Sequence, residues 1–293
     1  MPTTLTPLRY PGGKTQFYPL IKELLIKNGL IGHTYIEPFA GGAGVAIKLL
    51  INNDVNRIII NDIDPAIHAL WYSILHYSDN LCSMIEETPI TVKEWHRQKK
   101  IYQNKKSKKL DLGFSTLFLN RTNVSGVIKG GIIGGIQQNG SYGIDERYNK
   151  TTLIKKIKTI NEHKEKIDIF NIDALELFEL NEIKTLKKTF LNFDPPYISK
   201  GAGLYKNSYT NDDHKKLASM IKKCSRRWIV TYDVHPLISE LYMGFRYDYL
   251  DLNYSINKKR KAREYIFFSP NIHLSKDFKP HINKKQRRPQ DVQ

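Results

Sequence analysis

An alternation of short β-branched runs with helical patterns constrains the fold of this chain more than any other feature. The run Tyr35-Ile36 is followed by a glycine-rich turn at residues 40–44 and a helical pattern over residues 45–51. A second run, residues 57–60, ends in acidic residues and leads into a helical pattern that extends to Leu75. Such alternation is typical of a parallel sheet with helices on both faces. We therefore predict an α/β fold with a doubly wound sheet.

This pattern is interrupted in the middle of the chain. Between residues 78 and 160 we find lysine-rich helical patterns and no strand, and seven of the 18 glycines lie between Gly126 and Gly143. Strand patterns return at residues 167–170, 189–193 and 228–232, and near residues 245–252 and 264–269. We predict a main domain of residues 1–77 and 161–270, an inserted, mostly helical module of residues 78–160 with a long functional loop, and a poorly ordered basic tail of residues 271–293.

The composition favours a polyanion as the partner of this chain. Its 293 residues include 46 Lys+Arg and 29 Asp+Glu, which gives a net charge of +17. Nucleic acid is the first candidate, although a general bias toward lysine is the alternative explanation. Two cysteines are too few for a disulfide framework or a cysteine-rich zinc site, and we predict no bound metal. The sequence shows no membrane span and no signal peptide, so we expect a cytoplasmic protein.

The glycine-rich turn carries an acidic residue in an unusual place. In Glu37-Pro38-Phe39-Ala40-Gly41-Gly42-Ala43-Gly44 the carboxylate precedes the glycines. Glycines between a strand and a helix let the backbone approach a ligand. A carboxylate there would repel a pyrophosphate and attract a cation such as an ammonium or a sulfonium. A purely structural turn is the alternative.

Two further acidic residues follow predicted strands. Asp62, after residues 57–60, occupies a place where open α/β sheets bind ribose hydroxyls. Its neighbour Asp64 is an equally good N-cap for the following helix. Asp173, after residues 167–170, could accept a hydrogen bond from an adenine amino group, or could cap a helix that begins at Ala174.

Asp194-Pro195-Pro196-Tyr197 is the most specific motif. The two prolines fix two φ angles, so the Asp194 side chain and the backbone carbonyls are held rigidly at the end of a strand. An acceptor pair beside an aromatic ring can hold an exocyclic amino group, with the ring stacked on a base. A strand-ending turn with a surface tyrosine is the alternative. A weaker motif, Arg9-Tyr10-Pro11-Gly12-Gly13-Lys14, precedes the first helix and is suited to an anion.

The order of these motifs resembles the α group of amino-methyltransferases, and most closely the Dam-type DNA adenine N6-methyltransferases. Residues 118–122, Phe-Leu-Asn-Arg-Thr, resemble a stretch at the start of the DNA-recognition region of that family. The resemblance covers most of residues 7–270. It implies a seven-stranded, Rossmann-like methyltransferase sheet, with residues 78–160 as an inserted DNA target-recognition domain.

The same resemblance implies S-adenosylmethionine as cofactor and an adenine that is flipped out of duplex DNA. Asp194 and the Pro195 carbonyl would accept the two N6 hydrogens, and Tyr197 would stack on the base, with Pro196 completing the catalytic motif. Asp62 would hold the ribose of the cofactor, and Asp173 and the strand end at Phe193 its adenine. The remaining cofactor residues would be Tyr10, Gly12, Lys14, Glu37, Pro38, Phe39 and Gly41.

Double-stranded DNA is the implied partner, and GATC is the default target only because it is common in the family. The predicted DNA contacts are Arg9, Asn120, Arg121, Asn123, Lys129, Arg147, Asn149, Lys259 and Arg260. For each cation, ordinary surface charge is the alternative. We expect a nucleoid-associated monomer, which a cognate restriction endonuclease could accompany.

Two other functions are compatible with these motifs. The same fold could act on cytosine N4, an RNA adenine or a protein glutamine amide, since each presents an amino group on an sp² carbon. A DNA-binding protein without activity is the third possibility, but every expected catalytic position is intact.

Overall fold

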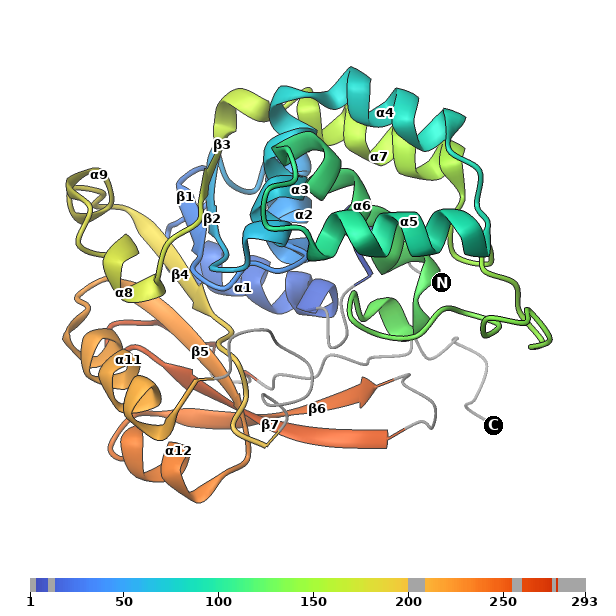
Figure 1. Ribbon diagram of the computed structural model, residues 1–293. Helices are drawn as coiled ribbons and strands as arrows, with labels where there is room; N and C mark the ends of the chain where they lie inside the picture. Colours follow the sequence, from blue (N-terminus) through green and yellow to red (C-terminus); the bar gives the residue numbers. More distant parts are fainter. Residues whose placement is uncertain (1–3, 10–13, 200–208, 255–259, 276–277, 279–293) are drawn as a thin grey trace, which may run out of the picture.

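A seven-stranded sheet forms the centre of the protein (Figure 1), in the order β3-β2-β1-β4-β5-β7-β6. The structure is a computed structural model that describes residues 4–9, 14–199, 209–254, 260–275 and 278, with the backbone alone at 251–254 and 260–262. The strands are β1 Thr34–Glu37, β2 Arg57–Asn61, β3 Ile167–Phe170, β4 Thr189–Phe193, β5 Arg227–Asp233, β6 Tyr247–Tyr254 and β7 Arg260–Phe268. Strands β1 to β5 are parallel, and β7 is antiparallel to both β5 and β6. The predicted seven-stranded, Rossmann-like α/β fold is confirmed.

Helices cover both faces of the sheet because its strands are apolar on both sides. In β2, Ile58 and Ile60 belong to one hydrophobic core and Ile59 to the other. The first core is closed by α1 (Tyr18–Lys27), α2 (Gly44–Ile51) and α3 (Pro65–His76), with the short 3-10 helix η1 (Lys14–Phe17) before α1. The second core is closed by α8 (Ala174–Leu177), α9 (Asn181–Lys184), α11 (Asn211–Lys223) and α12 (Pro236–Leu241).

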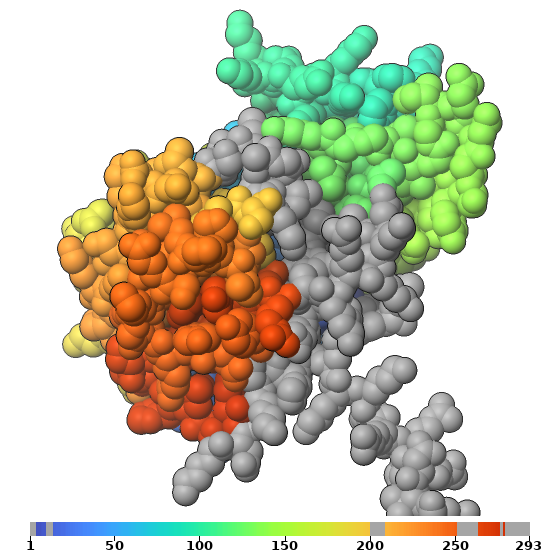
Figure 2. Space-filling model, turned by 90° about the horizontal axis from the view of Figure 1, so that it is seen from below, coloured from blue at the N-terminus to red at the C-terminus, as the bar shows by residue number. Residues whose placement is uncertain are grey.

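The chain between β2 and β3 is helical after α3, as expected. It contains α4 (Ser78–Glu87), α5 (Val92–Gln103), α6 (Lys109–Thr122), η2 (Val124–Gly126), α7 (Lys150–Asn161) and η3 (Lys164–Lys166). Helix α6 packs against α3 and α5, which joins this segment to the sheet. Seen from below, the green residues of this segment and the orange and red residues of α11 to β7 gather on opposite sides of the molecule (Figure 2).

Two expectations about these elements are wrong in detail. The first lysine-rich helical pattern of this segment, which covers residues 95–109, predicts a helix that is too long, because α5 ends at Gln103 and Lys109 already begins α6. Asn104 separates them: its side-chain oxygen accepts the backbone N–H of Lys106 at 3.0 Å, a local bond that competes with the helix.

The tail predicted to be poorly ordered over residues 271–293 begins with an ordered stretch. Ile272 is buried in the first core, and the backbone N–H of His273 donates to Asn28 Oδ1 at 2.8 Å. Ser275 Oγ donates to Glu23 of α1 at 2.9 Å. The start of the tail is therefore packed on α1, and residues 279–293 lie outside the described part of the chain.

Candidate active site

The predicted site residues meet at the edge of the sheet where the parallel strands end. The loops after β1, β2, β4 and β5 all leave from this edge, which is where open α/β sheets bind ligands. Strand β7 runs the other way, so its first residues reach the same edge. Its register pairs Glu264 with Asp233, the last residue of β5.

Four side chains form what we call the Lys14 cluster: Lys14, Asp194, Tyr197 and Glu264. Lys14 Nζ donates to Glu264 Oε2 at 2.8 Å and lies 3.2 Å from Asp194 Oδ1. It also donates to the hydroxyl of Tyr197, which lies 2.6 Å from Glu264 Oε2. The side chains of Lys14 and Glu264 are only 9% and 1% exposed. A buried ammonium is thus shared by two carboxylates.

The cluster holds Asp194 by one of its two oxygens. Oδ1 accepts from Thr231 Oγ1 at 2.7 Å, and the Tyr197 hydroxyl lies 3.1 Å from it, in addition to Lys14. Within the described residues no hydrogen bond to Asp194 Oδ2 is found, and the side chain is 27% exposed. Oδ2 is therefore the oxygen that a ligand can use.

The pKa values in the cluster reflect burial and shared charge. Burial raises the pKa of Asp194, Glu264 raises it further, and Lys14 opposes them. Burial acts to lower the pKa of Lys14, but Asp194 and Glu264 outweigh it and the net shift is upward. Lys14 consequently stays charged, and Asp194 binds a proton more readily than a carboxyl in water.

Glu37, at the end of β1, is a second buried carboxyl at this edge. Its Oε1 accepts from the Tyr35 hydroxyl at 2.9 Å, and that hydroxyl accepts from Asn192 Nδ2 at 2.9 Å. Burial raises the pKa of Glu37 to about 7, with a further contribution from Asp194. A cation bound nearby would favour the ionised form, as expected for a carboxylate that meets an ammonium.

The glycine-rich turn is held in place from two sides. Gly41 donates its N–H to Asp62 Oδ2 at 2.9 Å, and its carbonyl accepts from Trp71 Nε1 at 3.0 Å. A Cβ at Gly44 would lie 2.2 Å from Thr15 Oγ1, so this glycine lets α2 approach the start of η1. The turn and the segment that carries Lys14 are thereby brought into contact.

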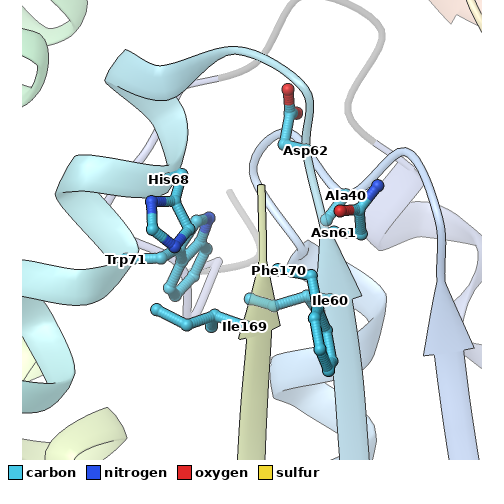
Figure 3. A pocket seen from close by; sticks show the side chains of 8 residues that line it. All are labelled: Ala40, Ile60, Asn61, Asp62, His68, Trp71, Ile169 and Phe170. Carbon is cyan, nitrogen blue, oxygen red and sulfur yellow. The ribbon is translucent and has the colours of Figure 1, made fainter. Parts of the chain in front are cut away.

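A small pocket lies beside this turn (Figure 3), and Asp62 stands beyond the end of β2 at its rim. It is lined by Ala40, Ile60, Asn61, Asp62, His68, Trp71, Ile169 and Phe170. Burial raises the pKa of Asp62 to about 6, although the N–H groups of Asp64 and Gly41 oppose this shift. The pocket thus combines apolar walls with one carboxylate.

The caps proposed as alternatives are confirmed. Asp64 Oδ1 accepts the backbone N–H of Ala66 and begins α3. Asp173 Oδ1 accepts the N–H of Leu175 and begins α8. Asp62 is not a cap of α3, but its two oxygens already accept two backbone N–H groups, so it both shapes the turn and faces the pocket.

Several predicted cofactor and catalytic residues are placed differently from expectation. The Phe193 side chain is fully buried against Phe178, so only its backbone lies at the site edge. Tyr197 is 7% exposed with its hydroxyl in the Lys14 cluster, which leaves little of its ring open for stacking. Phe39 is partly buried against Tyr209, and Pro38 offers its carbonyl to Asn61. Tyr10, Gly12, Lys259 and the side chain of Arg260 lie outside the described residues.

Three asparagines predicted to contact DNA have structural roles that leave their side chains occupied. Asn120 is 1% exposed, and its amide bonds the N–H and carbonyl of Arg9 and the carbonyl of Gly126. Asn123 is fully buried between Trp95 and the loop after α6. Asn149 caps α7 with its side-chain oxygen and is exposed. The placement of the two buried asparagines, Asn120 and Asn123, does not support direct base contact.

The predicted arginines form a second group of charges. We call Arg9, Arg121, Arg147 and Lys156 the arginine cluster. Burial, and then repulsion by Arg9, lowers the pKa of Arg121 to about 10. Burial and the charge of Arg121 lower the pKa of Lys156 to about 8. A Cβ at Gly126 would lie 2.4 Å from the Arg9 carbonyl oxygen, so this glycine lets the loop after α6 meet Arg9.

The arginine cluster lacks internal compensation. Arg9 Nη1 and Arg121 Nε are buried without a hydrogen-bond partner among the described residues. Over the same residues, no carboxylate pairs with Arg9, Arg121 or Lys156, and the contact of Arg147 with Glu146 is long, at 3.7 Å. Lys129, the remaining predicted cation, is exposed in the glycine-rich loop. Buried, unpaired guanidinium groups of this kind are suited to an external anion.

Two residues of the site were missed by reasoning from the sequence. Glu264 lies in the middle of β7, opposite the last residue of β5, whereas the acidic site residues predicted from the sequence all follow strands. Thr231 lies inside β5, and only the pairing of β4 with β5 brings it to Asp194. Among the described helices none is long and apolar enough to cross a membrane, and no three His, Cys, Asp or Glu side chains there could hold a metal ion.

Comparison with known proteins identifies the family of this chain. The profile of the D12 class N6 adenine-specific DNA methyltransferases matches residues 10–256. The Type II methyltransferase M.MjaIII of Methanocaldococcus jannaschii is 26% identical over 283 residues, which is 88% of this chain and 94% of that protein. The Type II methyltransferase M.CviBI of Paramecium bursaria Chlorella virus NC1A is 22% identical over 246 residues, 81% of this chain and 86% of the relative.

Among solved structures, the rRNA methyltransferase aviRa from Streptomyces viridochromogenes aligns with a TM-score of 0.42 and 12% identity, over 89% of this chain and 86% of that one. The profile match spans most of the chain and includes the glycine-rich turn and the Asp194-Pro-Pro-Tyr197 motif. The chain belongs to the D12 class N6 adenine-specific DNA methyltransferases, and it is an adenine-specific DNA methyltransferase.

Proposed function

We propose that this enzyme transfers a methyl group from S-adenosylmethionine to N6 of an adenine that has been flipped out of double-stranded DNA. The observation that carries the proposal is the state of Asp194. It is held by one oxygen in the Lys14 cluster, and its other oxygen has no partner in the described structure. A rigid acceptor at the ligand-binding edge of the sheet suits an exocyclic amino group.

The residues at this edge fit the proposed cofactor. Glu37 supplies a buried carboxylate for an ammonium, and the pocket beside Asp62 pairs apolar walls with an acceptor for hydroxyls. Lys14, Pro38, Phe39 and Gly41 would complete the methionine end together with Tyr10 and Gly12. Asp173 and the backbone at Phe193 would face the adenine. When bound, S-adenosylmethionine supplies an electrophilic methyl group on a sulfonium.

The chain's own residues would position the acceptor nitrogen. Asp194 Oδ2 and the Pro195 carbonyl would accept the two N6 hydrogens, which places the nitrogen lone pair for in-line attack, and Pro196 keeps this backbone rigid. As the nitrogen gains the methyl group it becomes positive and then loses one proton, for which Asp194 is the nearest base. For Tyr197 to stack on the base, its ring would have to turn out of the Lys14 cluster.

We further propose that residues 78–160 are the DNA target-recognition domain and that the arginine cluster binds backbone phosphates. The cluster joins this segment to Arg9, five residues before Lys14. Unpaired cations there would gain partners only when DNA is bound. Exposed Lys129 could contact phosphate in the same way. The target sequence, with GATC as the default, a monomeric state and a companion restriction endonuclease also belong to this proposal.

The first test is methylation of unmethylated plasmid DNA with labelled S-adenosylmethionine, followed by nucleoside mass spectrometry and methylation-sensitive sequencing. We expect N6-methyladenine at one short motif. Asp194→Ala should lower the rate on the order of a thousandfold, because the nitrogen loses its acceptor, while DNA binding is retained. Normal methylation by this variant would contradict the mechanism. N4-methylcytosine, or transfer only to RNA or protein, would contradict the proposed substrate.

A further inference from the structure

Glu264 is the one charged residue of the Lys14 cluster that the proposed chemistry does not yet use. It lies on β7, 67 residues beyond Tyr197, and is 1% exposed. Its Oε2 accepts from both Lys14 Nζ and the Tyr197 hydroxyl, at 2.8 and 2.6 Å. A buried carboxylate is costly unless it is paired, so its place beside Asp194 calls for an explanation.

The charges of the cluster do not cancel. Lys14 contributes one positive charge, and Asp194 and Glu264 contribute one negative charge each. If Lys14 had Asp194 as its only partner, the pair would be neutral. Lys14 Nζ lies 2.8 Å from Glu264 and 3.2 Å from Asp194, so this one ammonium compensates the charge of Asp194 only in part.

We propose that Glu264 is a positioning residue for methyl transfer: it holds the Lys14 ammonium and the Tyr197 hydroxyl, so that Asp194 meets the target amino group with uncompensated negative charge. This inference rests on the proposed function. The amino nitrogen becomes positive as the N–C bond forms and the electron pair of the breaking C–S bond goes to sulfur. A fixed negative charge beside it stabilises that change more than it stabilises the bound substrate.

Other charged and titratable groups around Asp194 must be considered in a test. Among the described residues, the groups that interact with it are Lys14 from η1, Tyr35 and Glu37 from β1, Tyr197 from its own loop, Tyr232 from β5, and Glu264 from β7. The charge of Glu264 raises the pKa of Asp194, so the removal of Glu264 should change that pKa in a defined direction. Without that negative charge the pKa of Asp194 falls, and Asp194 stays ionised at lower pH.

The experiment measures single-turnover methyl transfer by the full chain between pH 5 and 9, at saturating S-adenosylmethionine and DNA. At saturating cofactor, a change in cofactor affinity caused by the titration of Glu37 or Asp62 does not alter the measured rate. We expect Glu264→Gln to lower the plateau rate on the order of a hundredfold and to shift the acid limb of the profile to lower pH. A purely structural loss would lower the rate without this shift.

Glu264→Asp serves as the matched variant, because it keeps the charge and moves it by one methylene. Its rate should lie between those of the wild type and Glu264→Gln, and its acid limb should stay near that of the wild type, which tests the proposal even where Glu264→Gln fails to fold. An unchanged plateau, an acid limb that stays or moves up, or an aspartate variant as slow as the glutamine variant would overturn the inference. An inactive wild type would instead overturn the proposed function.

Discussion

The Lys14 cluster and the arginine cluster gather charge in opposite ways. In the first, one buried lysine is shared by two carboxylates and a tyrosine hydroxyl. In the second, Arg9, Arg121 and Lys156 lie together with no carboxylate partner in the described structure, and two guanidinium nitrogens are unsatisfied. The first is organised before any ligand arrives, and we propose that DNA phosphates complete the second. Under that proposal, the difference separates a site for a neutral amino group from a site for a polyanion.

Removal of the central cation should have the largest effect on stability. Lys14→Met removes the cation that the buried carboxylates of Asp194 and Glu264 share, and we expect the free energy of unfolding at pH 8 to fall by about 3 kcal/mol. Without Lys14 the pKa of Asp194 rises further above its unfolded value, so the deficit should be full at high pH and shrink as pH falls toward 5.

Chemical denaturation at pH 8 and pH 5 measures this prediction. Lys215→Met, which breaks an exposed ion pair with Asp212, is the control and should cost no more than about 0.5 kcal/mol at either pH. An equal loss at the two pH values for Lys14→Met would show that packing, and not charge, explains the effect.

Removal of a charge from the arginine cluster should change the stability of the protein in the opposite direction. Arg121→Met removes a buried, unpaired charge, so we expect the free energy of unfolding to rise by about 1 kcal/mol. The same variant should bind duplex DNA about tenfold more weakly at 0.1 M salt, with the slope of log Kd against log salt reduced by about one.

Fluorescence anisotropy across a salt series, together with denaturation, tests both parts. Lys222→Ala, at the exposed end of α11, should leave the DNA affinity and the slope unchanged. Loss of stability in Arg121→Met with DNA affinity preserved would assign this arginine to the fold and remove it from the interface.

The smallest effect that we predict is a pH dependence of DNA binding. The pKa of Lys156 is lowered to about 8, so its charge is present below that pH and lost above it. DNA affinity should therefore fall about fivefold as pH rises from 7 to 9. Lys156→Met should bind like the wild type at pH 9 and show little change between the two values, as measured by the same anisotropy assay. A pH dependence that persists in this variant would have another origin.

The local sequence was sufficient to predict the position of a motif wherever that motif acts through its own backbone. The strand–turn–helix at residues 35–51, the acidic strand end at Asp62 and the Asp194-Pro-Pro-Tyr197 turn all lie where the patterns predicted. The caps at Asp64 and Asp173 were foreseen as alternatives for the same reason, since a cap depends on residues only two or three positions away.

The sequence was insufficient to predict the role of a side chain wherever that role depends on segments distant in the sequence. Asn120 and Asn123 have amide groups suited to a DNA contact, but burial and bonds to the backbone occupy them, and Asn149 uses its oxygen to cap α7. No pattern within the sequence distinguishes an asparagine that reads DNA from one that organises a loop, because the difference lies in what surrounds the side chain.

The sequence by itself determined the α/β class of this protein, the order of its motifs and the acceptor at Asp194, because periodicity and turn residues act over a few positions. Only the tertiary structure decided which charges meet. The antiparallel pairing of β7 places Glu264, in the middle of that strand, opposite the last residue of β5 and so at the edge where the parallel strands end. Close backbone approaches at Gly44 and Gly126 join Lys14 and Arg9 to their clusters. Charged side chains interact when they are close in space, and for segments that are distant in the sequence this proximity depends on how the elements pack.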